Sequence, residues 1–161
     1  MIVAFLVHRG ENNNVIHRFG GKITEVIAML NIIYGAKGSG KTQRVIEAAN
    51  AAAEKSKGVV VYLSNEADHS GAVSNAVRYV DVTAYDLKTE QCLLSFLKGL
   101  LAGNYDITDV LIDGPTKFIG ANVAESEGLY DKIAMIGNDF NVNFTVTVSA
   151  EELPDFLRKY M

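Results

Sequence analysis

The sequence is poor in the residue types that mark several classes of protein. It has no tryptophan, two prolines, three histidines and one cysteine, Cys92. A single cysteine cannot form a disulfide within the chain or supply the group of thiols that a zinc site needs. Proteins outside the cell often depend on disulfides, so we expect a reducing, cytoplasmic environment for this chain.

Positive charge and long apolar runs are scarce as well. The chain has 15 Lys+Arg against 19 Asp+Glu, for a net charge of −4 at pH 7. Proteins that bind nucleic acids usually carry an excess of positive charge, so the sequence gives no strong nucleic-acid signal. No stretch approaches the ~20 consecutive apolar residues of a membrane-spanning helix. The sequence therefore predicts no membrane span.

What is present is the pattern of a globular α/β domain. Of the 161 residues, 48% are hydrophobic and 21% charged, close to the average for globular proteins. From residue 29 onward, short β-rich runs alternate with longer helical patterns, which predicts right-handed crossovers and a parallel sheet covered on both faces. The expected strands are 30–34, 59–63, 78–82, 109–113 and 143–148, and the expected helices are 41–55, 87–102, 122–138 and 151–160. For the last helix, Ser149 and Glu152 have the spacing of a capping box.

One motif dominates the sequence. It matches G-x-x-x-x-G-K-[ST], follows an expected strand and precedes an expected helix, which is the context that confirms a phosphate-binding loop. Its residues are Gly35, Ala36, Lys37, Gly38, Ser39, Gly40, Lys41 and Thr42. The glycines allow the backbone N–H groups to surround an anion, and the helix that follows adds its N-terminal dipole. We expect Lys41 to reach the β- and γ-phosphates of a nucleoside triphosphate, and Thr42 to bind Mg²⁺.

This part of the chain resembles the P-loop NTPase superfamily. From Met29 onward it also looks like a group of small, mostly uncharacterised P-loop proteins of Gram-positive bacteria, some of which carry the label of twitching-motility ATPases. The resemblance implies a three-layer α/β/α P-loop domain over residues 29–161 that binds ATP or GTP with magnesium. Guanine selection in GTPases relies on N-K-x-D, and the nearest string, Asn65 to Asp68, has glutamate in place of lysine. ATP is therefore the expected nucleotide.

A second motif supports the first. The apolar run 110–112 ends in Asp113, as the Walker B strand of the superfamily does, and we expect Asp113 to act in catalysis by holding Mg²⁺. Two expected strands separate the phosphate loop from Asp113. This spacing favours a recombinase-like strand order, in which the strand at 143–148 lies between the phosphate-loop strand and the Asp113 strand.

The base that activates water is not evident next to Asp113. Many ATPases of the superfamily have glutamate there, whereas this chain has Gly114. Recombinase-like members use an acid after the second strand, which makes Glu66 the first candidate and Asp68 the second. Thr147 and Ser149 are candidates for a hydrogen bond to the γ-phosphate or to the attacking water. A stabilising positive charge is expected from an arginine, without a choice among Arg44, Arg78 and Arg158.

Residues 1–28 have no counterpart in the P-loop pattern. Codons for the segment 25–27 can read GAGGTGAT, which resembles a bacterial ribosome-binding site just upstream of Met29. We therefore expect Met29 to be the natural start and residues 1–28 to be a translated leader. The alternative is a genuine N-terminal extension, with a hairpin formed by residues 2–7 and 15–19.

Three functions remain open from the sequence. The first is Mg²⁺-dependent ATP binding with weak ATPase activity, in which Lys41, Glu66 and Asp113 are the catalytic residues. The second is a kinase for a small molecule or nucleoside, with the segments 66–75 and 115–126 as the candidate lids. The third is a nucleotide-dependent regulatory module without catalysis, acting on a protein partner that the sequence does not identify.

Overall fold

The computed structural model describes residues 8–9, 14–19, 22–27 and 29–161. Its centre is a sheet of five parallel strands in the order β4-β8-β7-β5-β6. The strands are β4 (Leu30–Gly35), β5 (Val59–Ser64), β6 (Val77–Asp81), β7 (Ile107–Ile112) and β8 (Asn143–Ser149). The sheet predicted from residue 29 onward is confirmed. β8 lies between β4 and β7, the strand that Asp113 follows, as the spacing of the motifs predicted.

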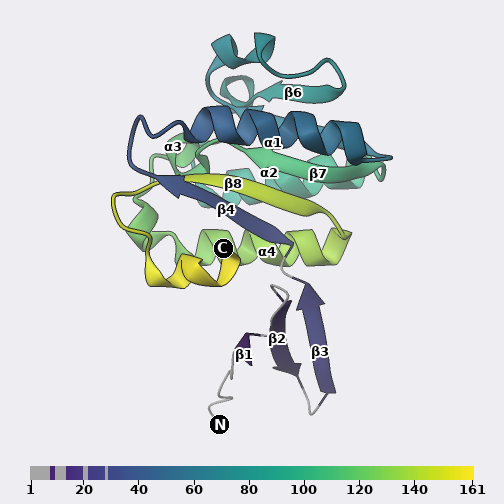
Figure 1. Ribbon diagram of the computed structural model, residues 1–161, viewed down its shortest axis with the longest axis vertical. Helices are drawn as coiled ribbons and strands as arrows, with labels where there is room; N and C mark the ends of the chain where they lie inside the picture. Colours follow the sequence, from purple (N-terminus) through teal and green to yellow (C-terminus); the bar gives the residue numbers. More distant parts are fainter. Residues whose placement is uncertain (1–7, 10–13, 20–21, 28) are drawn as a thin grey trace.

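Helices cover both faces of this sheet (Figure 1). On one face lies α1 (Lys41–Lys55), whose buried residues Val45, Ile46 and Ala49 belong to one core cluster with residues of β5, β6 and β7. On the other face, α2 (Glu90–Gly103) and α4 (Glu127–Phe140) bury the leucines and isoleucines of their apolar stripes in a larger core cluster. A strand that is covered by helices on both faces is apolar on both sides. Its sequence is therefore a nearly continuous run of hydrophobic residues.

Short helical segments fill the connections. They are η1 (Ala67–Gly71), η2 (Val82–Tyr85), α3 (Pro115–Ile119), η3 (Val123–Glu125) and η4 (Asp155–Tyr160). The sequence predicts no helix at 115–121, but Pro115 occupies the first turn of α3, where its fixed φ favours a helix and its missing N–H costs nothing. None of the helices in the described ranges is long and apolar enough to cross a bilayer.

The predicted C-terminal helix at 151–160 is wrong. Ser149 is the last residue of β8 and caps no helix, and helical structure resumes only in η4, after Pro154. A helix that began at 151 would need the residue before Pro154 in the α region, which the proline ring disfavours, and a backbone N–H that proline lacks. The segment between β8 and η4 is therefore irregular, and it lies beside the glycine-rich loop, since the Ala150 N–H bonds to the Gly35 oxygen.

The first part of the chain forms a separate sheet. β1 (His8–Arg9), β2 (Asn14–Phe19) and β3 (Lys22–Ile27) pair in the antiparallel order β1-β2-β3. The strand expected at 15–19 is present, but its full-length partner is β3. The other half of the expected hairpin, residues 2–7, lies outside the described residues. A natural start at Met29 stays a prediction.

Candidate functional site

The glycine-rich loop connects β4 to α1 with the backbone geometry that its glycines allow. Gly38 and Gly40 have φ angles of 81° and 80°, in the left-handed region that residues with a side chain rarely adopt. Gly40 is the N-cap of α1 and has no side chain with which to bond to the N–H groups of the first helical turn. These groups and the helix dipole are the features that bind anions at helix N-termini.

Lys41 folds back over this loop. Its ammonium donates a hydrogen bond to the backbone oxygen of Ala36 at 2.7 Å, and the residue is only 7% exposed. Burial and, next, the positive charge of Lys117 lower the pKa of Lys41, while the carboxylates of Asp113 and Glu151 act in the opposite direction. A cation held in this way lacks a full anionic partner, and a phosphate oxygen would supply one.

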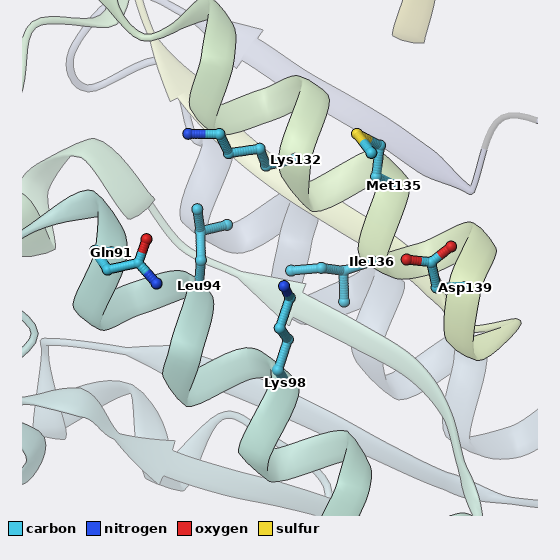
Figure 2. A pocket seen from close by; sticks show the side chains of 7 residues that line it. All are labelled: Gln91, Leu94, Lys98, Lys132, Met135, Ile136 and Asp139. Carbon is cyan, nitrogen blue, oxygen red and sulfur yellow. The ribbon is translucent and has the colours of Figure 1, made fainter.

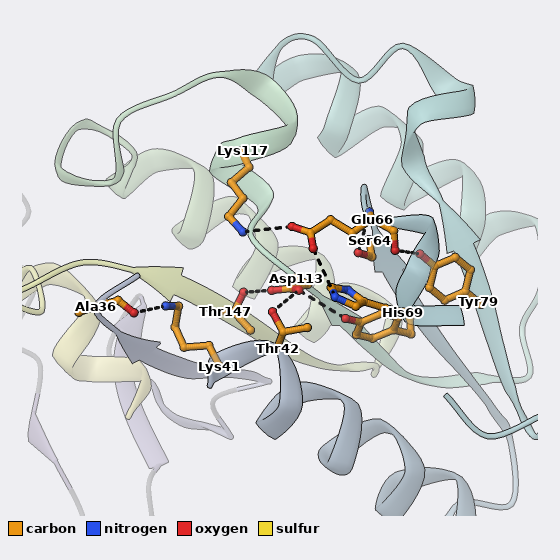
Figure 3. A network of polar contacts seen from close by, with 11 residues as sticks. Ala36, Lys41, Thr42, Ser64, Glu66, His69, Tyr79, Asp113, Lys117 and Thr147 are labelled. Carbon is orange, nitrogen blue, oxygen red and sulfur yellow. Dashed lines mark hydrogen bonds and ion pairs between the residues drawn. The ribbon is translucent and has the colours of Figure 1, made fainter. Parts of the chain in front are cut away.

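Asp113 is the centre of the polar network in Figure 3. It follows β7 and is 3% exposed, and its backbone N–H bonds to the Leu63 oxygen at the end of β5. The Thr42 hydroxyl donates to Asp113 Oδ2 at 2.9 Å, and the Thr147 hydroxyl donates to Oδ1 at 2.6 Å. The fold thus brings a residue of α1 and a residue of β8 to one buried carboxylate.

Tyr62 completes the contacts of this carboxylate. Its hydroxyl donates to Asp113 Oδ2 at 3.5 Å from inside the sheet. Burial, followed by the negative charge of Asp113, raises the pKa of the Tyr62 phenol, so that it remains a protonated donor at neutral pH. Three hydroxyls on three elements therefore hold Asp113 in one orientation. Of the predicted pair at the end of β8, Thr147 enters this network, whereas Ser149 is exposed.

Thr42 and Asp113 fit magnesium. A hydroxyl oxygen and a carboxylate oxygen 2.9 Å apart are hard ligands of the kind that Mg²⁺ prefers. Within the described part of the chain, no group of three or more His, Cys, Asp and Glu residues is arranged to hold a metal. Mg²⁺ does not require such a cage, because it is often bound by one or two protein carboxylates together with water and the phosphates of a ligand.

Glu66 lies at the carboxyl end of β5, next to the Asp113 strand. Its carboxylate is half exposed and is 3.3 Å from His69 Nε2 and 3.9 Å from Lys117 Nζ. The backbone of Glu66 is fixed as well, because its N–H bonds to the Ser64 hydroxyl and its oxygen accepts from Tyr79. The side chain of Asp68, the second candidate base, lies outside what the structure describes.

Lys117 is the residue that the sequence did not single out. It lies on α3, and its methylenes cover Gly114, since a Cβ at Gly114 would come within 3.0 Å of Lys117 Cδ. Its ammonium contacts Glu66 and its charge acts on Lys41, so it faces the site. Of the three arginines considered, Arg158 instead bonds Asp155 in η4. Recognising Pro115 as a helix start would have placed Lys117 on the first turn after Asp113.

A surface pocket lies away from this polar network. It has a volume of about 260 Å³ and lies between α2 and α4, where Leu94 and Ile136 form apolar walls (Figure 2). Lys132 at its rim bonds to Glu90 at 2.7 Å. Because it lies in the helical layer rather than at the carboxyl ends of the strands, it is separate from the glycine-rich loop.

Comparison with known proteins does not assign the chain to a family. No family model matches the chain, and no curated protein matches it significantly. A functional assignment must therefore come from the site itself.

Proposed function

We propose that this protein is a P-loop NTPase that binds Mg·ATP and hydrolyses it slowly. The observation that carries the proposal is the hydrogen bond from Thr42, directly after the loop lysine, to the buried Asp113 carboxylate at the end of β7. In P-loop NTPases the corresponding hydroxyl and carboxylate hold Mg²⁺. A glycine-rich turn without this function would have no need of an acid 71 residues away.

The strand order supports a place among the recombinase-like members. β8 separates the phosphate-loop strand β4 from the Asp113 strand β7. This puts Thr147, from the intervening strand, beside Asp113. A hydroxyl at this position is suited to sense the γ-phosphate or the attacking water.

Each residue of the site has a separate role in the proposed hydrolysis. The loop N–H groups and Lys41 bind the phosphates, and Thr42 and Asp113 hold Mg²⁺, which when bound neutralises the phosphate charge. Glu66 accepts the proton of the attacking water. Lys117 supplies a second cation opposite Lys41. The bond from the γ-phosphorus to the bridging oxygen breaks as the water oxygen attacks, and ADP and phosphate leave.

Calorimetric titration of the full chain tests the proposal. We expect Mg·ATP to bind and Mg·GTP to bind more weakly, since the chain has no N-K-x-D motif. Absence of ATP binding at millimolar nucleotide would overturn the proposal. Binding without any phosphate release would instead leave a nucleotide-dependent regulatory module.

Replacing Glu66 with glutamine should separate binding from hydrolysis. The amide has nearly the same shape but cannot accept the proton of water, and loss of a general base typically costs roughly 10² to 10⁴ in rate. ATP affinity should change little, and phosphate release should fall by about that factor. Glu54→Gln, at an exposed position of α1, is the matched control. Equal phosphate release in the Glu66 and Glu54 variants would exclude Glu66 as the base.

Replacing Lys117 with methionine should shift the pH dependence of ATP binding. Lys41 must be protonated to attract phosphate, and the charge of Lys117 is the second cause that lowers the pKa of Lys41. Removing it raises that pKa, so the loss of binding at alkaline pH should move to higher pH. Affinity at pH 7 should also weaken several-fold.

Titrations between pH 7 and 10.5 measure both effects. Lys55→Met, in the last turn of α1, controls for the loss of one positive charge. An alkaline limb that stays in place in the Lys117 variant would contradict the electrostatic coupling.

A further inference from the structure

A larger cavity adjoins the phosphate loop. Its volume is about 510 Å³, within the range of small-molecule sites. One wall is formed by α3 and the segment up to Ala124, and the other by the irregular segment from Ser149 to Pro154. Both walls follow the carboxyl ends of β7 and β8, the edge at which ligands of parallel sheets bind (Figure 1).

Several contacts tie this cavity to the phosphate site. Ser149 is the strand partner of Gly35, the first residue of the loop, and the Ala150 N–H bonds to the Gly35 oxygen at 3.2 Å. Glu151, which follows Ala150 in the chain, raises the pKa of Lys41 through its negative charge. Lys117 both lines the cavity and contacts Glu66. A molecule in the cavity would therefore lie beside the position of the γ-phosphate.

The lining indicates the chemistry of that molecule. Its polar groups are the hydroxyls of Thr116 and Ser149, the ammonium of Lys117, the Asn122 amide and the Glu152 carboxylate. These groups offer hydrogen-bond donors and acceptors at several points, with small apolar residues between them. None of the described residues that line it is aromatic, so it offers no ring on which a nucleobase would stack. This pattern fits a neutral molecule with several hydroxyl groups better than a nucleoside.

We propose that this cavity binds a sugar or another small polyol, and that the polyol accepts the γ-phosphoryl group of ATP. The proposal rests on the function proposed above, with the acceptor hydroxyl in place of water. The hydroxyl oxygen forms the new bond to the γ-phosphorus, and the bond from phosphorus to the bridging oxygen breaks. ADP leaves with that electron pair, and the hydroxyl proton passes to Glu66. The products are ADP and a polyol phosphomonoester.

The test incubates the full chain and Mg·ATP with glucose, ribose, inositol or glycerol, and in parallel with adenosine or thymidine. ADP is measured by a coupled assay, and phosphomonoesters are detected by ³¹P NMR. We expect at least one polyol to raise ADP formation about tenfold over the acceptor-free rate, with the matching phosphomonoester as product.

Two variants locate the effect in the cavity. Ala124→Trp fills one wall and should abolish stimulation by the polyol, whereas Ala51→Trp, exposed on α1, should leave it unchanged. ATP affinity of the same samples distinguishes a filled cavity from an unfolded chain. Glu152→Gln, which removes a negative charge and one acceptor oxygen without adding bulk, should raise the KM for the polyol and keeps the test valid if the tryptophan variant does not fold.

The outcomes separate this inference from the function on which it rests. If ATP is bound and hydrolysed but no polyol is phosphorylated, the acceptor site is wrong and the proposed hydrolysis stands. Phosphorylation of nucleosides alone would overturn the polyol assignment. If a polyol still stimulates ADP formation in a folded Ala124→Trp variant, the polyol does not bind in this cavity. Absence of ATP binding would overturn the proposed function itself.

Discussion

A chain in which Lys41 is replaced by methionine should lose most of its affinity for Mg·ATP. Lys41 is buried against the loop, where its ammonium bonds to the Ala36 oxygen and is opposed by the charge of Lys117. A hydrogen bond to a charged group contributes about 1.5 to 3 kcal/mol, so its loss should weaken binding roughly 10- to 100-fold. The fold should persist, because methionine retains the shape of the buried stem without the buried charge.

The matched control for this variant is Lys37→Met in the same loop. Lys37 is exposed, so its replacement removes the same formal charge without removing a buried contact. Calorimetric affinities of the two variants, with unfolding by urea as the check on stability, give the comparison. If the Lys41 variant binds ATP as tightly as the Lys37 variant, the loop is not the phosphate site.

Replacing Asp113 with asparagine should nearly abolish hydrolysis. The amide cannot hold Mg²⁺ as the carboxylate does, and it is a weaker acceptor for the hydroxyls of Thr42 and Thr147. Correct placement of a catalytic metal contributes several kcal/mol to the transition state, and a loss of about 3 kcal/mol corresponds to roughly a hundredfold in rate. Phosphate release should therefore fall by at least this factor, with loss of its dependence on magnesium concentration.

Asp109→Asn provides the comparison on the same strand. Asp109 lies near the start of β7 and pairs with Asn143, far along the strand from the loop. Phosphate release across a magnesium titration should match the wild type in this control. A normal magnesium response in the Asp113 variant would show that another group holds the metal.

Much of the central domain follows from sequence pattern. The buried strands have continuous apolar runs, and α1 begins and ends at the residues expected, because the glycine-rich loop fixes its start. The position of β8 beside β4 also agrees with the spacing of the motifs. Local sequence patterns were sufficient to predict an element where the apolar periodicity and the positions of the glycines indicated the same boundaries.

The connections at the carboxyl edge were less predictable. The C-terminal pattern resembled an amphipathic helix with a capping box, but Pro154 excludes that helix. Conversely, β7 ends before Gly114 and Pro115, and Pro115 begins α3, a helix that the sequence pattern does not predict. Proline permits either outcome, and its position relative to the rest of the turn decides between them.

The single cysteine and the lack of excess positive charge limited the possible classes of protein, and one glycine-rich loop with Lys37 and Lys41 indicated the ligand that we propose for the domain. Those properties depend on residue chemistry and local geometry, which a sequence carries directly. The side chains that surround that loop in the folded protein depend on which strands become neighbours in the sheet. Only the tertiary structure brings Thr147 and Tyr62 to Asp113, because these residues lie on strands that are far apart in the chain. For the same reason, only the tertiary structure places Lys117 next to both Glu66 and the open cavity.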